Sequence, residues 1–381
     1  MTHVLLLCPA RIPSAILCGH AQFEWLGEKG LIEYRWNTSG RVTDKLAFWA
    51  DVVIFVRSDS DLEVSLAKKL KSAGRYLIYA LDDDLLNVPE YINSAEFYNC
   101  LKTQKNIREA MEICDCLLSP SVRLLEKYGA LFSRTAWVEE PSLAQRGIKR
   151  ASNGPVRIGF AGSVDRSWDI DELLTGAIGK LLQNYGDRIS VEFFGARPTM
   201  VDQYGLKHIP YCDSYEEYLR TMKSLDWEIG LAPMPDTEFH ACKHYNKFVE
   251  YIGYGVVGVY SDVEPYKRVV RNGENGLLCG NTKEEWYAAL VRLIEDQNLR
   301  ETISANCLAE ARERFTVEAT ALELREALGD ILSFESERIV IQGIMRLRIY
   351  YWCQWILSQC SKYRLKAPIV MIKKLKAKLF D

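Results

Sequence analysis

The sequence predicts a parallel α/β protein with two domains. Apolar segments at residues 51–57, 156–161 and 256–260 are rich in β-branched residues, as are strands buried on both faces. Residues 243–279 show the order helix, strand, helix, strand that is typical of a parallel sheet. A chain of 381 residues, 48% of them hydrophobic, is long enough for two cores of ordinary size.

The first domain is expected over residues 1–145. Apolar runs predict its strands, and helical spacing of apolar residues predicts the helices between them. The expected strands are 4–8, 51–57, 75–81 and 135–138, and the expected helices are 62–73 and 95–114. Residues 114–129 are expected to form a further strand and helix, with Ser119 or Ser121 as the cap. Residues 141–155 are polar, contain Gly and Pro and lack periodicity, so we place the linker there.

The second domain is expected over residues 156–332, with residues 333–381 as a separate tail. Its expected strands are 156–161, 189–194, 227–231, 256–260 and 277–279. Its expected helices are 169–185, 215–224, 245–254, 263–271 and 283–295, followed by two more that end near residue 332. Alternating strands and helices again predict a parallel sheet.

Charge and cysteine content exclude several classes of protein. The net charge is -3, but residues 331–381 contribute +7, so the tail is basic and the rest is acidic. No nucleic-acid-binding module accompanies this charge, and we expect no nucleic-acid partner. The eleven cysteines include no CxxC pair, which favours buried thiols in a reducing cytosol over zinc. We expect no metal and no cofactor.

The N-terminal segment is predicted to be a strand and not a signal sequence, because its apolar run covers only residues 4–8. The chain has no stretch of 18 uninterrupted apolar residues, so no transmembrane helix is expected. We therefore expect a cytoplasmic protein.

Two polar segments follow predicted strands of the first domain. Arg11 lies in a loop between two prolines, which forms either a ligand contact or a rigid surface turn. Asp82, Asp83 and Asp84 follow the strand at 75–81, and three neighbouring carboxylates repel one another unless cations or donors face them. They predict a DxD metal site, a hydroxyl-binding or helix-capping cluster at a cleft edge, or a simple cap with solvated neighbours.

A glycine turn follows the first strand of the second domain. Gly162 and Ser163 precede a predicted helix, and Arg166 could bind phosphate beside its N-terminus. A purely structural turn is the alternative. A second polar loop, at residues 232–243, follows the strand at 227–231. It offers the candidate residues Asp236, Glu238, His240 and Lys243. We expect His240 and the nearby His244 to be exposed or capping residues, because no paired metal ligand is evident.

These segments resemble the two-domain GT-B glycosyltransferases, in particular the group 1 or family 4-like branch of bacterial surface-polysaccharide synthesis. The resemblance rests on IGFAGS at 158–163, WEIGLAPMPDTEFHACKHYNKFVEYIGYG at 227–255 and YSDVEPYKRVVRNGENGLL at 260–278. In the first domain only the strand followed by DDDLL is similar. The resemblance implies two Rossmann-like domains that face each other across a cleft, and the charge pattern of residues 333–381 adds a basic C-terminal helical tail.

The resemblance also implies roles for single residues. Glu250 matches the carboxylate that binds the ribose of a nucleotide sugar, and a carboxylate can accept two hydroxyl hydrogen bonds. Lys243, Lys247 and Arg166 are candidates for the diphosphate, although a helical lysine such as Lys247 can also be merely solvated. The family commonly has two glutamates with seven residues between them, but Cys242 stands where the first would be. Asp236 or Glu238 is expected to substitute for it.

The implied reaction is metal-independent transfer of a sugar from a nucleoside diphosphate to a hydroxyl acceptor, with retention of configuration. Arg166 and Lys243 would stabilise the departing diphosphate, and carboxylates would stabilise the oxocarbenium-like sugar. The acceptor would bind the first domain near Arg11 and residues 82–84. An epimerase of the same fold and a non-catalytic nucleotide-sugar-binding subunit are the alternatives.

The basic tail alternates apolar clusters and cations. Over residues 338–378, arginines and lysines lie beside tryptophans and tyrosines, which suits a helix in an anionic membrane interface. A lipid-linked glycan acceptor would explain such a peripheral membrane contact. The alternative is a helix packed against the first domain.

Overall fold

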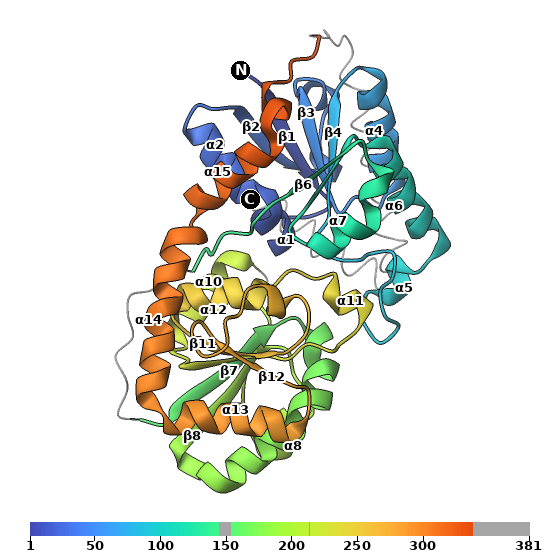
Figure 1. Ribbon diagram of the computed structural model, residues 1–381. Helices are drawn as coiled ribbons and strands as arrows, with labels where there is room; N and C mark the ends of the chain where they lie inside the picture. Colours follow the sequence, from blue (N-terminus) through green and yellow to red (C-terminus); the bar gives the residue numbers. More distant parts are fainter. Residues whose placement is uncertain (145–153, 213, 338–381) are drawn as a thin grey trace. The chain divides into compact units, whose positions relative to one another are not determined.

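A computed structural model describes residues 1–144, 154–212 and 214–337 of the chain (Figure 1). Within these residues the chain forms two compact units, each built on a parallel sheet. The first unit comprises Met1–Glu90, Ser94–Val138 and the described residues from Glu323 onward. The second comprises Tyr91–Asn93 and Glu139–Leu322. The parallel α/β class predicted from the sequence is confirmed.

The first unit has a six-stranded sheet of order β2-β1-β3-β4-β5-β6. The strands are β1 (His3–Cys8), β2 (Glu33–Thr38), β3 (Val52–Val56), β4 (Tyr76–Ala80), β5 (Cys116–Ser119) and β6 (Arg134–Trp137). The helices are α1 (Pro13–Ala15), α2 (Ala21–Glu28), α3 (Asp44–Ala47), α4 (Asp61–Ser72), α5 (Ala95–Tyr98), α6 (Leu101–Ile113) and α7 (Val122–Tyr128). Figure 1 shows α4 and α6 on one face of this sheet and α2 on the other.

The second unit has a sheet of order β12-β11-β10-β7-β8-β9. The strands are β7 (Val156–Gly162), β8 (Ile189–Gly195), β9 (Lys207–Ile209), β10 (Ile229–Ala232), β11 (Val257–Ser261) and β12 (Leu277–Cys279). The helices are α8 (Ser167–Tyr185), α9 (Met200–Tyr204), α10 (Tyr215–Ser224), α11 (Glu238–Ala241), α12 (Asn246–Tyr254), α13 (Lys283–Glu295) and α14 (Gln297–Arg314), followed by α15 (Val317–Leu328). Helices α8 and α13 cover one face, and α10 and α12 the other (Figure 1).

Local sequence signals explain where most helices begin. Ser60 accepts from the backbone N–H of Glu63, whose carboxylate bonds back to Ser60 N–H, so α4 starts with a capping box. Thr282 caps α13, because its hydroxyl accepts from the backbone N–H of Glu285. Gly255 adopts a left-handed conformation with φ of 65° and ends α12. These caps fix the helix boundaries close to the predicted ones.

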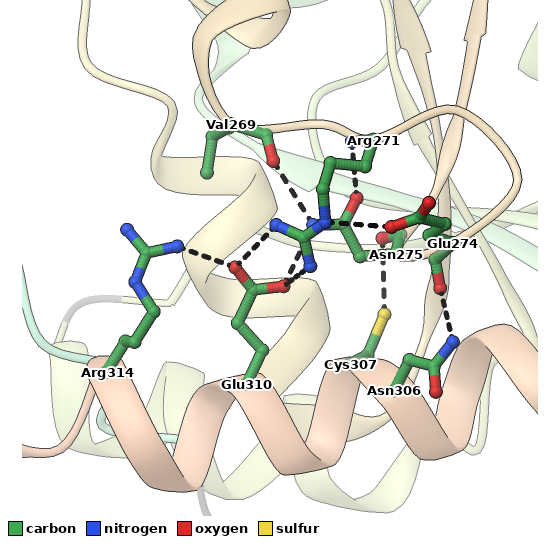
Figure 2. Close-up of polar contacts among 8 residues, drawn as sticks. All are labelled: Val269, Arg271, Glu274, Asn275, Asn306, Cys307, Glu310 and Arg314. Carbon is green, nitrogen blue, oxygen red and sulfur yellow. Dashed lines mark hydrogen bonds and ion pairs between the residues drawn. The ribbon is translucent and has the colours of Figure 1, made fainter.

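The helix expected at residues 263–271 is not formed, and only a 3₁₀ turn at Tyr266–Arg268 is present. Pro265 lacks an N–H, and Asn275 binds the backbone instead: its amide donates to Val269 O, and its Oδ1 accepts from Arg271 N–H. In Figure 2 this Asn275 amide also donates to Glu310 of α14 over 2.8 Å. A buried side chain thus replaces helical hydrogen bonds.

Three further elements differ from the sequence analysis. The helix expected at 95–114 is split into α5 and α6, because Cys100 between them has an extended backbone. Strand β2 was not predicted, since its sequence is polar and it lies at the sheet edge. Helix α11 lies inside the segment expected to be a loop, so Glu238 and His240 are helical residues.

The unit boundaries also differ from the expected domain limits. The second unit begins at Glu139 and ends at Leu322, rather than spanning 156–332. Residues 323–337 contact the first unit: the hydroxyl of Thr2 donates to Leu332 O, and buried Asp51 accepts from the N–H and hydroxyl of Ser336. Such long-range contacts leave no local signal in the sequence. The predicted tail at 338–381 lies outside the described residues.

Candidate functional site

The carboxyl ends of β7 and β10 bring two of the predicted polar segments together. In the sheet, β8 lies on one side of β7, and β10, which comes later in the chain, lies on the other side. The loops after β7 and β10 therefore diverge at a topological switch point, the position where open parallel sheets bind ligands. One loop contains Ser163 and Arg166, and the other contains Asp236.

The glycines at the start of this edge permit close backbone approach. A Cβ atom at Gly162 would lie 2.8 Å from the Phe160 ring. Gly195 on the neighbouring β8 has a φ of 81°, and a Cβ there would overlap the Gly162 carbonyl. Ser163 is exposed, and its side chain makes no capping bond to the turn that follows. Backbone and hydroxyl groups of this turn are thus available to an anion.

Arg166 spans the switch point. Its Nη2 donates to Pro233 O over 2.6 Å, and its Nε lies 3.4 Å from Asp169 Oδ2. The side chain is 18% exposed, and its two Nη atoms also lie 3.8 and 3.9 Å from the Met234 sulfur. The role of Arg166 as a phosphate-binding cation stays a prediction.

The predicted carboxylates of the second loop are exposed at the start of α11. Asp236 and Glu238 flank Thr237, whose hydroxyl accepts from the backbone N–H of His240 and so caps the helix. Lys243 follows α11, and its Nζ lies 4.4 Å from the centre of the Phe239 ring. These residues share one short segment next to the switch point.

Cys242, which replaces the first glutamate of the resembling family, is fully buried. Its Sγ lies 3.9 Å from a carboxylate oxygen of Glu238. The Glu238 side chain therefore lies beside the position where the missing carboxylate would begin. The expectation that Asp236 or Glu238 substitutes for it stays a prediction.

His240 and His244 are buried, and neither is the capping side chain of α11 or α12, so the expectation that they are exposed or capping residues is wrong. His240 Nδ1 lies 2.8 Å from the Thr237 hydroxyl, and His244 Nε2 lies 3.0 Å from Glu139. Burial opposes protonation of His244, but Glu140 and Glu139 outweigh it and raise its pKa to about 10. Both glutamates come from the start of the second unit, far away in the sequence, so no local pattern predicts this cluster.

Lys247 and Glu250 pair on the first turns of α12. Lys247 Nζ forms an ion pair with Glu250, and the hydroxyl of Tyr218 from α10 donates to the same carboxylate. Burial and the Glu250 charge raise the pKa of Tyr218 well above its usual value, so this hydroxyl remains a donor. Glu250 is only 14% exposed, and the interpretation of Lys247 as merely solvated does not hold.

Asp82, Asp83 and Asp84 of the first unit each face a cation. Arg57, directly after β3, forms ion pairs with Asp82 and with Asp83, the latter over 2.7 Å. Asp84 is fully buried and accepts from Lys127 Nζ over 2.7 Å and from the Tyr128 hydroxyl over 2.5 Å. The alternative of a cap with solvated neighbours is therefore wrong. The described residues contain no cluster of His, Cys, Asp or Glu suited to a metal.

Arg11 lies at the carboxyl end of β1 and is exposed. Its guanidinium carbon lies 5.1 Å from the centre of the Trp36 ring, a distance at which cation and ring attract. Arg11 thus belongs to the same sheet edge as the aspartates, because β1, β3 and β4 are neighbouring parallel strands.

Four residues at these sites were not predicted from the sequence: Arg57, Asp169, Tyr218 and Trp36. Arg57 follows a fully buried strand and adopts a left-handed φ of 49°, which is uncommon outside glycine. The position of Arg57 at the end of a strand could have marked it as a candidate site residue. The other three residues are brought to these sites by contacts between distant segments, so no local pattern in the sequence indicates them.

The fold is that of the GT-B glycosyltransferases. HepE of Anabaena in complex with UDP-glucose is 16% identical, with a TM-score of 0.61 over 87% of this chain and 100% of that one. Sucrose-phosphate synthase from Thermosynechococcus elongatus is 12% identical, with a TM-score of 0.62 over 88% and 100%. A Listeria monocytogenes protein described as a UDP-N-acetylglucosamine 2-epimerase is 10% identical, with a TM-score of 0.56 over 89% and 100%.

No family model matches the chain, and no curated protein matches it by sequence. The similarity to solved structures therefore establishes the class of architecture, two parallel-sheet units of the GT-B type. Among the described residues, no helix is both long and apolar enough to span a membrane.

Proposed function

We propose that the protein is a glycosyltransferase that moves a sugar from a nucleoside diphosphate sugar to a hydroxyl acceptor. The observation that supports this most is the switch point of the second unit, where Arg166 bridges the glycine turn and the loop with Asp236. HepE, whose fold is similar, is described in complex with UDP and with UDP-glucose. A diphosphate suits this position, because convergent backbone N–H groups and a guanidinium bind its charge.

The donor would be held by residues of the second unit. Glu250 would accept the ribose hydroxyls, with its carboxylate already oriented by Tyr218 and Lys247. Gly162, Ser163 and Lys247 would contact the diphosphate. Burial raises the pKa of the Tyr266 hydroxyl, Arg166 lowers this pKa, and Glu250 raises it further. The charges of Arg166 and Glu250 therefore both lie near the buried Tyr266 ring.

The chemistry would depend on electrostatic stabilisation of the leaving diphosphate. Arg166 and Lys243 would neutralise the charge that develops as the glycosidic bond breaks. Asp236 and Glu238 would face the sugar, whose positive charge develops at the same time. We propose a metal-independent reaction with retention of configuration, and addition of EDTA without loss of turnover is the expected result.

The acceptor is proposed to bind the first unit through Arg11 and the segment at Asp82, Asp83 and Asp84. These groups lie after neighbouring strands of one sheet, where hydroxyl-rich ligands find both donors and acceptors. We propose a lipid-linked glycan of cell-surface polysaccharide synthesis, because the basic, aromatic tail suits peripheral contact with the inner face of the cell membrane.

The test is incubation with UDP-, GDP- and dTDP-sugars and a membrane lipid extract. Released nucleoside diphosphate together with an elongated lipid product is the expected result. The similar fold of a protein described as an epimerase favours epimerisation as the second candidate, which would change the free sugar nucleotide without acceptor. Donor binding without any turnover would instead point to a non-catalytic subunit, the candidate suggested by Cys242.

A further inference from the structure

Asp169 is a buried carboxylate on the first turn of α8 with no role in the proposal above. Its side chain is 2% exposed, and its Oδ2 lies 3.4 Å from Arg166 Nε and 3.4 Å from His240 Nε2. The hydroxyl of Tyr91 donates to its Oδ1 over 3.2 Å. A buried carboxylate is costly unless cations and donors face it, so these contacts hold Asp169 and its partners in place.

The charges of this cluster determine where the protons are. Burial raises the pKa of Asp169, but His240, Arg166 and Tyr91 outweigh it and lower this pKa below its usual value. Burial, together with Arg166 and Lys243, lowers the pKa of His240 more than Asp169 raises it. At neutral pH the carboxylate is therefore ionised and the imidazole is neutral.

A neutral imidazole carries one proton, and the two ring nitrogens are then distinct. Nε2 faces the ionised Asp169, so the proton belongs on this nitrogen, since a lone pair there would be repelled. Nδ1 is then an acceptor, and the Thr237 hydroxyl at 2.8 Å must donate to it. Thr237 Oγ1 accepts in turn from His240 N–H, so the hydroxyl has a fixed direction.

We propose that Asp169 is a positioning residue of the donor site: it orients Arg166 directly and, through His240, fixes the Thr237 hydroxyl. This inference rests on the proposed function for its ligand, a nucleoside diphosphate sugar. The proton of Thr237 is committed to His240, so its oxygen can only accept, which suits a hydroxyl of the transferred sugar. Asp236 and Glu238 on either side would be placed by the same contacts.

The first test is nitrogen NMR of the histidine rings in the full chain, which has five histidines. In the wild type, Nε2 of His240 should have the shift of a protonated nitrogen and Nδ1 that of an acceptor. Asp169→Leu removes the acceptor that faces Nε2 at similar side-chain volume, so the proton should move to Nδ1 and be donated to the Thr237 oxygen. Asp171→Leu is the matched control, because Asp171 lies on the same helix but accepts from Thr199 N–H instead. An unchanged tautomer in Asp169→Leu would overturn the proposal.

Thr237→Val is the second variant, chosen because Thr237 is exposed and its loss should leave the fold intact. It removes the hydroxyl that donates to Nδ1, so the Nδ1 shift should change while Nε2 stays protonated. A change at Nε2 instead would show that Asp169 does not determine the tautomer.

The third test measures UDP affinity by calorimetry. Asp169→Asn should raise the dissociation constant of UDP about tenfold, the loss typical of one hydrogen bond to a charged group, and Asp171→Asn should not change it. Because Asp169 acts on the Thr237 hydroxyl through His240, the double variant Asp169→Asn/His240→Gln should bind UDP-glucose, which carries a sugar for Thr237 to contact, no more weakly than Asp169→Asn. Additive losses would contradict the relay. If the wild type binds no UDP while the tautomer still switches, the proposed donor fails but the positioning by Asp169 stands.

Discussion

Glu250 is the residue on which donor recognition depends in the proposed function. Its carboxylate is oriented by two neighbours of different kinds, the Lys247 ammonium and the Tyr218 hydroxyl. In the proposed function, the remaining lone pairs of this carboxylate would accept the ribose hydroxyls. At 14% exposure, the Glu250 side chain is neither freely solvated nor fully buried.

Replacing Glu250 by Gln should raise the dissociation constant of UDP about 10- to 100-fold, because hydrogen bonds to an ionised acceptor become bonds to a neutral amide. Isothermal titration calorimetry measures this change. Glu216→Gln is the control, since Glu216 is exposed on the adjacent α10. Full UDP affinity in Glu250→Gln would refute the ribose assignment.

His244 should make stability depend on pH at the residue scale. Its pKa is about 10 in the folded protein and about 6.5 in an unfolded chain, because burial is outweighed by Glu140 and Glu139. The folded state therefore holds a proton that the unfolded state has released. This contribution is fully present below pH 6.5 and is lost as the pH rises through 10.

His244→Gln, which cannot be protonated, should accordingly unfold at a lower urea concentration than the wild type at pH 6. The difference should shrink as the pH approaches 10. His208→Gln, at a half-buried histidine beside Gly195 O, is the matched histidine-to-glutamine comparison. A difference that is constant across this pH range would mean that His244 is not charged in the folded state.

At the scale of elements, the turn at residues 269–276 is joined to α14 by Glu310 (Figure 2). Its carboxylate accepts from Arg271 over 2.8 Å, from the Asn275 amide over 2.8 Å and from Arg314 over 2.8 Å. Cys307 of the same helix donates to Asn275 O over 3.2 Å. The contacts stabilise an irregular segment of which only residues 269–271 were expected to be helical.

Glu310→Gln should lower the free energy of unfolding by about 2 kcal/mol at pH 7, because the buried Asn275 and two half-exposed arginines lose a charged acceptor. Burial raises the Glu310 pKa, but Arg271, Asn275 and Arg314 outweigh it and lower this pKa. The stabilisation is therefore present above about pH 4.5 and is lost as the pH falls through the folded pKa.

Urea unfolding at pH 7 and at lower pH values checks this expectation. The gap between the wild type and Glu310→Gln should close on acidification. Glu313→Gln, at an exposed position of α14, should leave the midpoint unchanged. Equal losses in both variants would assign the effect to helix charge rather than to the Glu310 contacts.

At the scale of the whole molecule, the chain returns to its first unit after the second unit is complete. Residues 323–337 bind the first unit through Leu332 O, Ser336 and the Ala327 carbonyl, which accepts from Arg134. Asp51 is central, because its fully buried carboxylate accepts from Ser336 and from the backbone N–H of His3.

Asp51→Ala should destabilise the first unit by about 2–4 kcal/mol, since several buried donors lose their acceptor. Hydrogen exchange should accelerate in β1 and β3 but not in β7 and β10, which belong to the second unit. Asp330→Ala is the control, because its ion pair with Arg134 is exposed and contributes little. Equal acceleration in both sheets would show that the units do not open separately.

The class of fold and the identity of most elements follow from local patterns in the sequence. Apolar runs such as 156–161 and helical spacing such as 283–295 are local properties, so they predict strands and helices directly. Their alternation determined the parallel sheets, and strand ends determined where Gly162, Ser163 and Arg166 would lie.

Which charged groups meet depends on the folded chain and not on local sequence patterns. Asp169 and His240 follow different strands, and His244 meets Glu139 across 105 positions of the chain. Likewise, residues 91–93 belong to the second unit and residues 323–337 to the first. The physical reason is that periodicity arises within a few turns of chain, whereas buried ion pairs form only after the sheet order brings distant segments together.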